Sequence, residues 1–263
     1  MAGPSQVHGA IEQGVSIRRA TAADAEVCGR ICFEAFTALA NRHNFPPDFP
    51  APEVSIGVLS AMFSHPGFFC VVAEQEGKII GSNCLDERTS IAGVRLVQAA
   101  YHNRSLSLYA KLGFVVREPL SCMRGPAMQK MLPGYWVRPA VAGDLAGCND
   151  LCKKIHGHER GGELQDAIEH GTAIVAERDG RVTAYASSMA FSGHAVGDTN
   201  EDLKALIAAA AAFQGPGILV PTRNAGLFRW CLENGLRVVQ PMTLMTMGHY
   251  NEPAGAYLPS ILY

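Results

Sequence analysis

The sequence predicts a mixed α/β protein made of two tandem copies of one unit, because three segments recur in the same order along the chain. IRRATAADAEVCGRIC from Ile17 recurs as VRPAVAGDLAGCNDLC from Val137, VVAEQEGKIIG from Val71 as IVAERDGRVTA from Ile174, and KLGFVVREPLSCM from Lys111 as ENGLRVVQPMTLM from Glu233. The offsets are 120, 103 and 122 residues. Repeats of this kind indicate duplication and have to be found before the fold is assigned.

Periodicity gives each copy the same order of elements: strand, amphipathic helix, further helix, two antiparallel strands, then strand, helix and final strand. Thr21 introduces a first helix over about residues 22–40, and its counterpart covers about residues 142–155. Charged turns around Gly77 and Gly180, each between apolar runs, are typical of β-hairpins.

The repeat also predicts the domain boundaries. PAMQKMLPG, with two prolines and a glycine, is the expected linker between the copies. We expect a disordered lead at 1–15, an N-terminal domain at 16–125, the linker at 126–134, a C-terminal domain at 135–250 and a tail at 251–263. Contact between the two copies is expected within the chain.

Composition narrows the class of protein. The chain of 263 residues is 48% apolar and 17% charged with a formal net charge of −2, so it lacks the basic excess that favours nucleic acid or an anionic membrane. Its longest strongly apolar stretch, 205–213, is much shorter than the roughly 20 residues of a membrane-spanning helix. The polar start resembles neither a secretion signal nor a transit peptide. We expect a cytoplasmic protein.

The eight cysteines form no CxxC pair and lie in apolar segments, so all are expected to be reduced and buried. Two pairs are spaced i,i+4, which leaves metal binding or oxidation open for them. His156, His158 and Glu159 also suggest a metal site, but no partner at zinc-like spacing accompanies them. The interpretation here is a solvated loop, and no metal is predicted.

The changes in offset locate two insertions. Copy one has 17 residues more after its first helix, in NRHNFPPDFPAPEV at 41–54, as the fall from 120 to 103 shows. Phe45 and Phe49 make this a candidate substrate-side lid, and a packed surface loop is the alternative. Copy two has 19 residues more after its hairpin, where residues 199–214 predict a helix with Thr199 or Asn200 as its cap.

VQAAYHNRSLSLYAKLGFVVRE, at 97–118, resembles the late strand, helix and LYxKLGF signature of the GCN5-related N-acetyltransferases. The resemblance implies two tandem acyl-CoA N-acyltransferase-like domains that transfer acetyl from acetyl-CoA to a small-molecule amine or an exposed amino group. It assigns Tyr109 as the acid that protonates the coenzyme thiolate, and reference pKa values of about 10 and 8.5 make that transfer feasible. A tyrosine that only packs in an amphipathic helix is the alternative.

The family usually has Asn seven residues before this Tyr, to meet the pantetheine arm. His102 occupies that position and Asn103 follows it, so the resemblance makes both candidates for coenzyme binding, with a helix cap as the alternative. The general base stays open among Glu74, Asp86 and Glu87, which lie on or beside the hairpin.

The family's Q/R-x-x-G-x-G/A pyrophosphate loop is missing from GSNCLDERTSIAG in copy one, which therefore lacks the central strand, loop and helix. We expect a tight turn at Thr89–Gly93 between mutually antiparallel strands, and an apolar patch left open.

Copy two places Asp198, Glu201 and Asp202 at its helix entrance, which indicates capping and not anion binding. Cys231 stands where copy one has Tyr109, and Asn224 precedes it by seven residues. Copy two is therefore expected to be structural. A non-catalytic binding or scaffold module is the alternative function for the whole chain.

Overall fold

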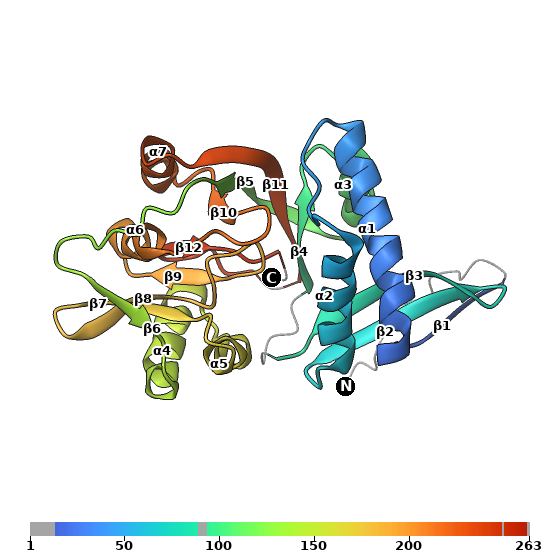
Figure 1. The fold of residues 1–263 in the computed structure, drawn as a ribbon, viewed down its shortest axis with the longest axis horizontal. Coiled ribbons are helices and arrows are strands. Elements are labelled where there is room, and N and C mark those ends of the chain that lie inside the picture. The colour runs from blue at the N-terminus through green and yellow to red at the C-terminus, as the bar shows by residue number, and fades with distance from the viewer. Residues whose placement is uncertain (1–13, 89–93, 249, 262–263) are drawn as a thin grey trace. The chain divides into compact units, whose positions relative to one another are not determined.

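The computed structural model describes residues 14–88, 94–248 and 250–261 (Figure 1). The chain divides into two compact units, one made of residues 1–36 and 49–85 and the other of residues 37–48 and 86–263. None of the helices in the described part has the length and apolarity needed to cross a membrane.

The first unit holds a three-stranded sheet in the order β1-β2-β3 with helices on one face. Its elements are β1 (Val15–Arg19), η1 (Ala22–Asp24), α1 (Ala25–Arg42, which continues into the second unit), α2 (Pro52–Ser64), β2 (Phe68–Gln75) and β3 (Lys78–Asp86). Alternate residues of β2, among them Cys70 and Val72, are buried in a core cluster to which α2 contributes Leu59. Gly29 of α1 lies so close to α2 that an added Cβ would be 2.5 Å from Ile56 Cα.

Two cysteines of this unit are joined, so the prediction that all eight are reduced was wrong for them. Cys70 on β2 and Cys84 on β3 form a disulfide. The two strands of the hairpin bring them together across 14 residues of sequence, a separation that carries no motif. None of the other six is disulfide-bonded.

The second unit contains the whole of copy two. Its elements are β6 (Trp136–Pro139), η2 (Ala142–Asp144), α4 (Leu145–His156), α5 (Gly161–Glu169), β7 (Ile174–Arg178), β8 (Arg181–Ala186), β9 (Ala195–Gly197), α6 (Asn200–Ala209), β10 (Ile218–Pro221), α7 (Ala225–Glu233), β11 (Arg237–Met247) and β12 (Ala256–Leu258). Five strands pair in the order β12-β9-β8-β7-β6. One face packs on α4 and α5 and the other on α6, so copy two is a three-layer α/β domain (Figure 1).

The predicted helices and hairpins are confirmed, except that the helix predicted over residues 199–214 ends at Ala209. Thr21 closes a capping box with Asp24 at the start of η1, and α1 follows directly. Both hairpins turn on a glycine with positive φ, 74° at Gly77 and 75° at Gly180. Each glycine follows an acidic residue that also has positive φ, as two-residue turns that match strand twist require.

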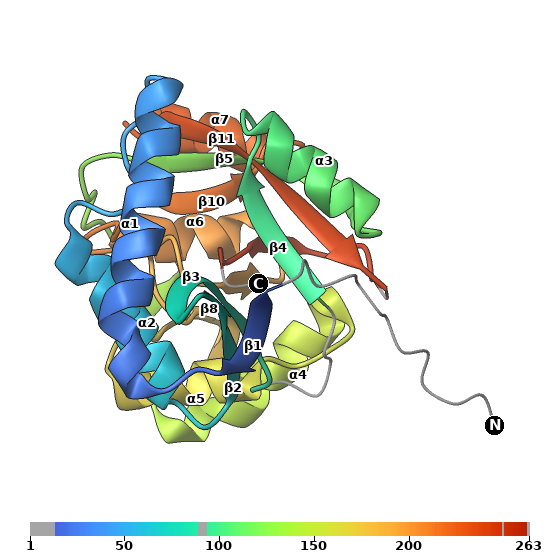
Figure 2. The same cartoon turned by 90° about the vertical axis from the view of Figure 1, so that its right-hand side faces the viewer.

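The last strands of the two copies are exchanged within one sheet, in the order β10-β5-β11-β4 (Figure 2). The copy-one elements here are β4 (Val94–Ala99), α3 (Asn103–Lys111) and β5 (Val115–Arg124). β5 pairs with β10 of copy two, and β11 of copy two pairs with β4 of copy one. This four-stranded sheet is therefore built from two strands of each copy.

A pseudo-twofold axis relates the two halves of this sheet. Leu120 of β5 lies opposite Met242 of β11, and these two residues are equivalent at the offset of 122. Pro119 pairs with Thr243 and Ser121 with Pro241, so the register is the same when the copies are interchanged. The contact expected between the copies takes this form. The strand exchange places strands of both copies in the second compact unit. The compact units therefore do not test the boundaries at 125 and 135, which stay predictions.

β3 and β4 lie in different sheets, so the predicted antiparallel pairing of these two strands was wrong. The described neighbour of β4 is β11, the copy-two equivalent of β5. The predicted turn at Thr89–Gly93 lies outside the described residues, as does the lead up to residue 13. Residues 87–93 alone separate β3 from β4, whereas copy two has β9 and α6 between β8 and β10.

Candidate functional site

The helix α3 carries three of the predicted site residues. His102 stands at its N-cap position, where its Nδ1 lies 2.7 Å from Ser105 Oγ. His102 and Tyr109 are half-buried, and Asn103 is exposed. Residues seven apart return to the same face of a helix, whereas the next residue is rotated by about 100°. The structure therefore places His102 and Tyr109 on one face and Asn103 away from it.

The Tyr109 ring packs edge-on against Phe114, with 5.5 Å between the ring centroids. Burial lowers the pKa of His102, and electrostatic interactions with His43, Arg104 and Arg42 lower it further. His102 is thus a neutral imidazole at neutral pH.

A recess of about 340 Å³ lies on the outer face of α3. It is lined by Asn103, Arg104, Ser107, Leu108 and Lys111. Asn103 therefore faces a different surface from Tyr109, although the two are only six residues apart.

The two phenylalanines of the proposed lid have separate environments. Phe45 stacks on Tyr101, with ring centroids 4.2 Å apart and planes at 14°. Phe49 belongs to the first unit, where its ring meets Phe36 edge-on at 6.2 Å. Phe45 therefore lies beside the segment that leads into α3, and both rings have packing partners.

A hydrogen-bond chain that sequence reasoning missed holds the loop to β11. Tyr101 Oη donates to Gln240 Oε1 at 2.9 Å, and Gln240 Nε2 donates to Asp48 Oδ1 at 2.8 Å. Gln240 is 1% exposed. Burial raises the pKa of Tyr101 to about 12, with a further contribution from Asp48, so the phenol stays neutral. No sequence signal links these residues, since Asp48 and Gln240 lie 192 positions apart.

Asp48 should make stability depend on pH. Burial raises its pKa above the unfolded value of 3.8, and the hydrogen bond from Gln240 offsets only part of this shift. The folded state then binds more protons, so the free energy of unfolding falls as pH rises from 3.8 through the folded pKa. Asp48→Asn keeps an acceptor for Gln240 without ionising, and should be more stable than the native protein above that pKa. Urea unfolding between about pH 4 and 8 measures this, and equal pH slopes for both proteins would contradict it.

Two of the three general-base candidates are engaged in ion pairs. Glu74 lies 2.8 Å from Arg18. Asp86 is bound by Arg88, whose hydrogen bonds hold the pKa of Asp86 below its usual range although burial alone would raise it. Glu87 is exposed. The identity of the general base therefore stays open.

The entrance of α6 in copy two is closed by its own side chains, which confirms the interpretation as capping. Thr199 and Asp202 form a capping box, in which Asp202 Oδ2 accepts from the Thr199 backbone N–H at 2.9 Å. Asp198 pairs with Lys154 and Arg181. Two carboxylates therefore occupy the place where an anion would have to bind.

The residues of copy two that match His102 and Tyr109 are engaged in hydrogen bonds or buried in the core. Asn224 caps α7 by accepting from Leu227 N–H, and exchanges two hydrogen bonds with Asn200, at 2.9 and 2.8 Å. Cys231 is 0% exposed, and burial raises the pKa of its thiol to about 12.

The predicted solvated loop around His156 was wrong, because His156 is 1% and His158 8% exposed. Residues distant in the sequence cover His156. His194 Nε2 lies 3.1 Å from His156 Nε2, and the Tyr257 ring packs edge-on against the His156 ring, with 5.3 Å between the ring centroids. Glu159 pairs with Lys153. In the part of the chain that the structure describes, no group of three or more His, Cys, Asp or Glu could hold a metal ion.

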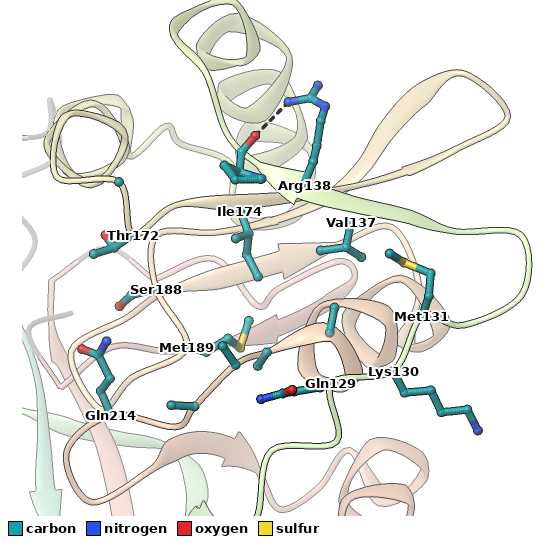
Figure 3. Close-up of a pocket in the computed structure, with 16 residues that line it drawn as sticks. Gln129, Lys130, Met131, Val137, Arg138, Thr172, Ile174, Ser188, Met189 and Gln214 are labelled. Atoms are coloured by element: carbon teal, nitrogen blue, oxygen red, sulfur yellow. Dashed lines mark hydrogen bonds between the residues drawn. The ribbon is translucent and has the colours of Figure 1, made fainter.

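A larger pocket, of about 700 Å³, lies beside the C-terminal end of α6 (Figure 3). Its apolar lining comes from Val137, Ile174, Met189, Met131 and residues 209–212. Figure 3 shows the Lys130 side chain directed away from it. The lining residues come from five segments of the sequence, so no local pattern could have predicted this pocket.

No family model matches the sequence, and no curated protein does either. Solved structures do match. A protein of Pyrococcus horikoshii, named as a candidate acetyltransferase, is 17% identical with a TM-score of 0.64, and 92% of each chain is covered. A GCN5-related N-acetyltransferase from Sphaerobacter thermophilus is 12% identical with a TM-score of 0.52, over 92% of this chain and 98% of that one. The chain has the fold of the GCN5-related N-acetyltransferases.

Proposed function

We propose that this protein is an N-acetyltransferase that moves an acetyl group from acetyl-CoA to an amine, with copy one as the reacting copy. The observation that carries the proposal is the pair His102 and Tyr109 on one half-buried face of α3, at the spacing with which the family meets the pantetheine arm and its thiolate. The fold supports the reaction class. The corresponding positions of copy two are occupied, so copy two serves as scaffold.

In the proposed reaction the amine nitrogen attacks the thioester carbonyl, and the carbon–sulfur bond then breaks. The Tyr109 phenol gives its proton to the departing thiolate, while the attacking nitrogen loses one to a base. Neutral His102 can orient the donor without adding charge.

We infer that neither copy holds the pyrophosphate of coenzyme A in the way that the family does. Copy one has only residues 87–93 between β3 and β4, and copy two presents carboxylates at the entrance of α6. We therefore propose that copy one lacks the strand, loop and helix that hold the pyrophosphate in the family. The donor would be held mainly through its pantetheine arm.

Calorimetry with two donors tests this proposal. Acetyl-CoA and S-acetylpantetheine, which has no phosphates, should bind the full chain with affinities within about tenfold of each other, because one lost charge-assisted contact alone is worth more than that. The His102→Ala variant should weaken both equally. No heat from either donor at near-millimolar concentration would leave the non-catalytic module as the function. A strong preference for acetyl-CoA would show that this chain does hold the phosphates, and the proposed loss of the pyrophosphate site would then be wrong.

A further inference from the structure

Among the residues that the structure describes, the sheet of the first unit has helices on one face and none on the other. Cys70 and Val72 of β2 point into the cluster under the helices, so the alternate residues Phe69 and Val71 point to the opposite side. Ile17 of β1 lies on that side too, since it pairs with Ala73. Ile17 is 59% exposed and Phe69 45%. Arg19 lies on the same face, opposite Val71, and its guanidinium carbon is 4.1 Å from the centre of the Phe69 ring, so the exposed apolar surface is bordered by a cation.

Copy two shows what covers the equivalent face. Val137, which matches Ile17 in the repeat, packs against the cluster that contains Leu203 and Leu206 of α6, each 0% exposed. Ala184 is 0% exposed beneath this helix. Its counterpart Gly81 meets nothing within 4 Å of an added Cβ. The same sheet position is therefore filled by α6 in one copy and open in the other.

The edge of the sheet differs in the same way. In copy two, β9 pairs with the outer side of β8, where Ala184 lies opposite Gly197 and Ala186 opposite Ala195. In copy one, β3 ends the sheet among the described residues. One continuous segment, residues 195–209, thus covers both the edge and the face in copy two. An unpaired edge next to an open apolar face is a ready template for another strand.

We propose that the first unit binds a strand-and-helix segment of a partner protein, with the strand added to the edge of β3 and the helix lying over Ile17 and Phe69. The helix would carry an apolar stripe of Leu, Ile and Ala like that of α6, where Leu203, Leu206 and Ile207 face the sheet. Copy one has Phe69 where copy two has Thr172 and Ile17 where it has Val137, so the partner helix needs small residues above these two side chains. Binding of this kind does not depend on whether the protein transfers acetyl groups.

A peptide from the chain itself is the probe. Residues 195–212, labelled with fluorescein, should bind the full-length protein with saturable anisotropy in the micromolar range. Ile17→Glu and Phe69→Glu should each weaken binding by about tenfold or more, because each replaces an apolar contact with a charged group beneath the partner helix. Val141→Glu is the matched control, since Val141 is also exposed (56%) but lies in the second unit, and should leave the affinity unchanged. A peptide with Leu206→Glu should not bind.

Each alternative result is informative. No saturation at near-millimolar peptide, with the circular dichroism of the protein intact, would overturn the proposal, and so would equal affinities for the native protein and Ile17→Glu. If ultracentrifugation instead shows a dimer that Ile17→Glu abolishes, the face belongs to a second copy of this chain and the partner helix is excluded. Both substitutions replace exposed residues, so folding is expected to survive them.

Discussion

Replacing Tyr109 with phenylalanine is expected to slow acetyl transfer by about 10²–10⁴-fold, the range for loss of a positioned general acid. The substitution keeps the ring that packs on Phe114, so the fold and donor affinity should be unchanged. The measurement is the steady-state release of free thiol with a panel of amines, at saturating donor.

The leaving group provides the control for this role. A thioester of an acidic aromatic thiol needs no proton to depart, so Tyr109→Phe should slow its turnover much less than that of acetyl-CoA. An equal loss with both donors would make Tyr109 a positioning residue. Cys231→Ala, at the equivalent place in copy two, should leave turnover unchanged, because Cys231 is buried and lies in the copy that we propose to be non-catalytic.

Removal of the Cys70–Cys84 disulfide is expected to lower the stability of the first unit by about 3 kcal/mol. The bond closes a loop with a sequence separation of 14, and chain-entropy arguments give about this value for a loop of this length. Urea unfolding of the double variant Cys70→Ala with Cys84→Ala, followed by hydrogen exchange in β2 and β3, measures the effect.

Reductant is the matched test for the disulfide. Dithiothreitol should destabilise the native protein by the same amount and leave the double variant unchanged. If the double variant unfolds at the same urea concentration as the oxidised native protein, the bond does not limit the stability of this unit. Loss of exchange protection in copy two as well would show that the two units unfold together.

The sequence located the candidate residues His102 and Tyr109, whose roles stay predictions, but not the contacts around them. The spacing of His102 and Tyr109 already placed both on one helix face, because helical periodicity is a local property. The contacts made by Asp48 and Gln240 could not be predicted, since they join a loop of copy one to a strand of copy two. Burial of His156 was missed for the same reason, as it depends on Tyr257, which lies about a hundred residues later.

What the sequence determined by itself is the duplication, the order of elements in each copy, the hairpins at Gly77 and Gly180, and the capped entrance of α6. All of these follow from periodicity, turn chemistry and capping, which act over a few residues. Only the tertiary structure decided that β5 pairs with β10 and β11, that β3 and β4 lie in different sheets, and that Cys70 bonds Cys84. Strands of a duplicated unit present nearly the same edge to either copy, so local sequence cannot choose between them, and the choice is made by packing over the whole chain.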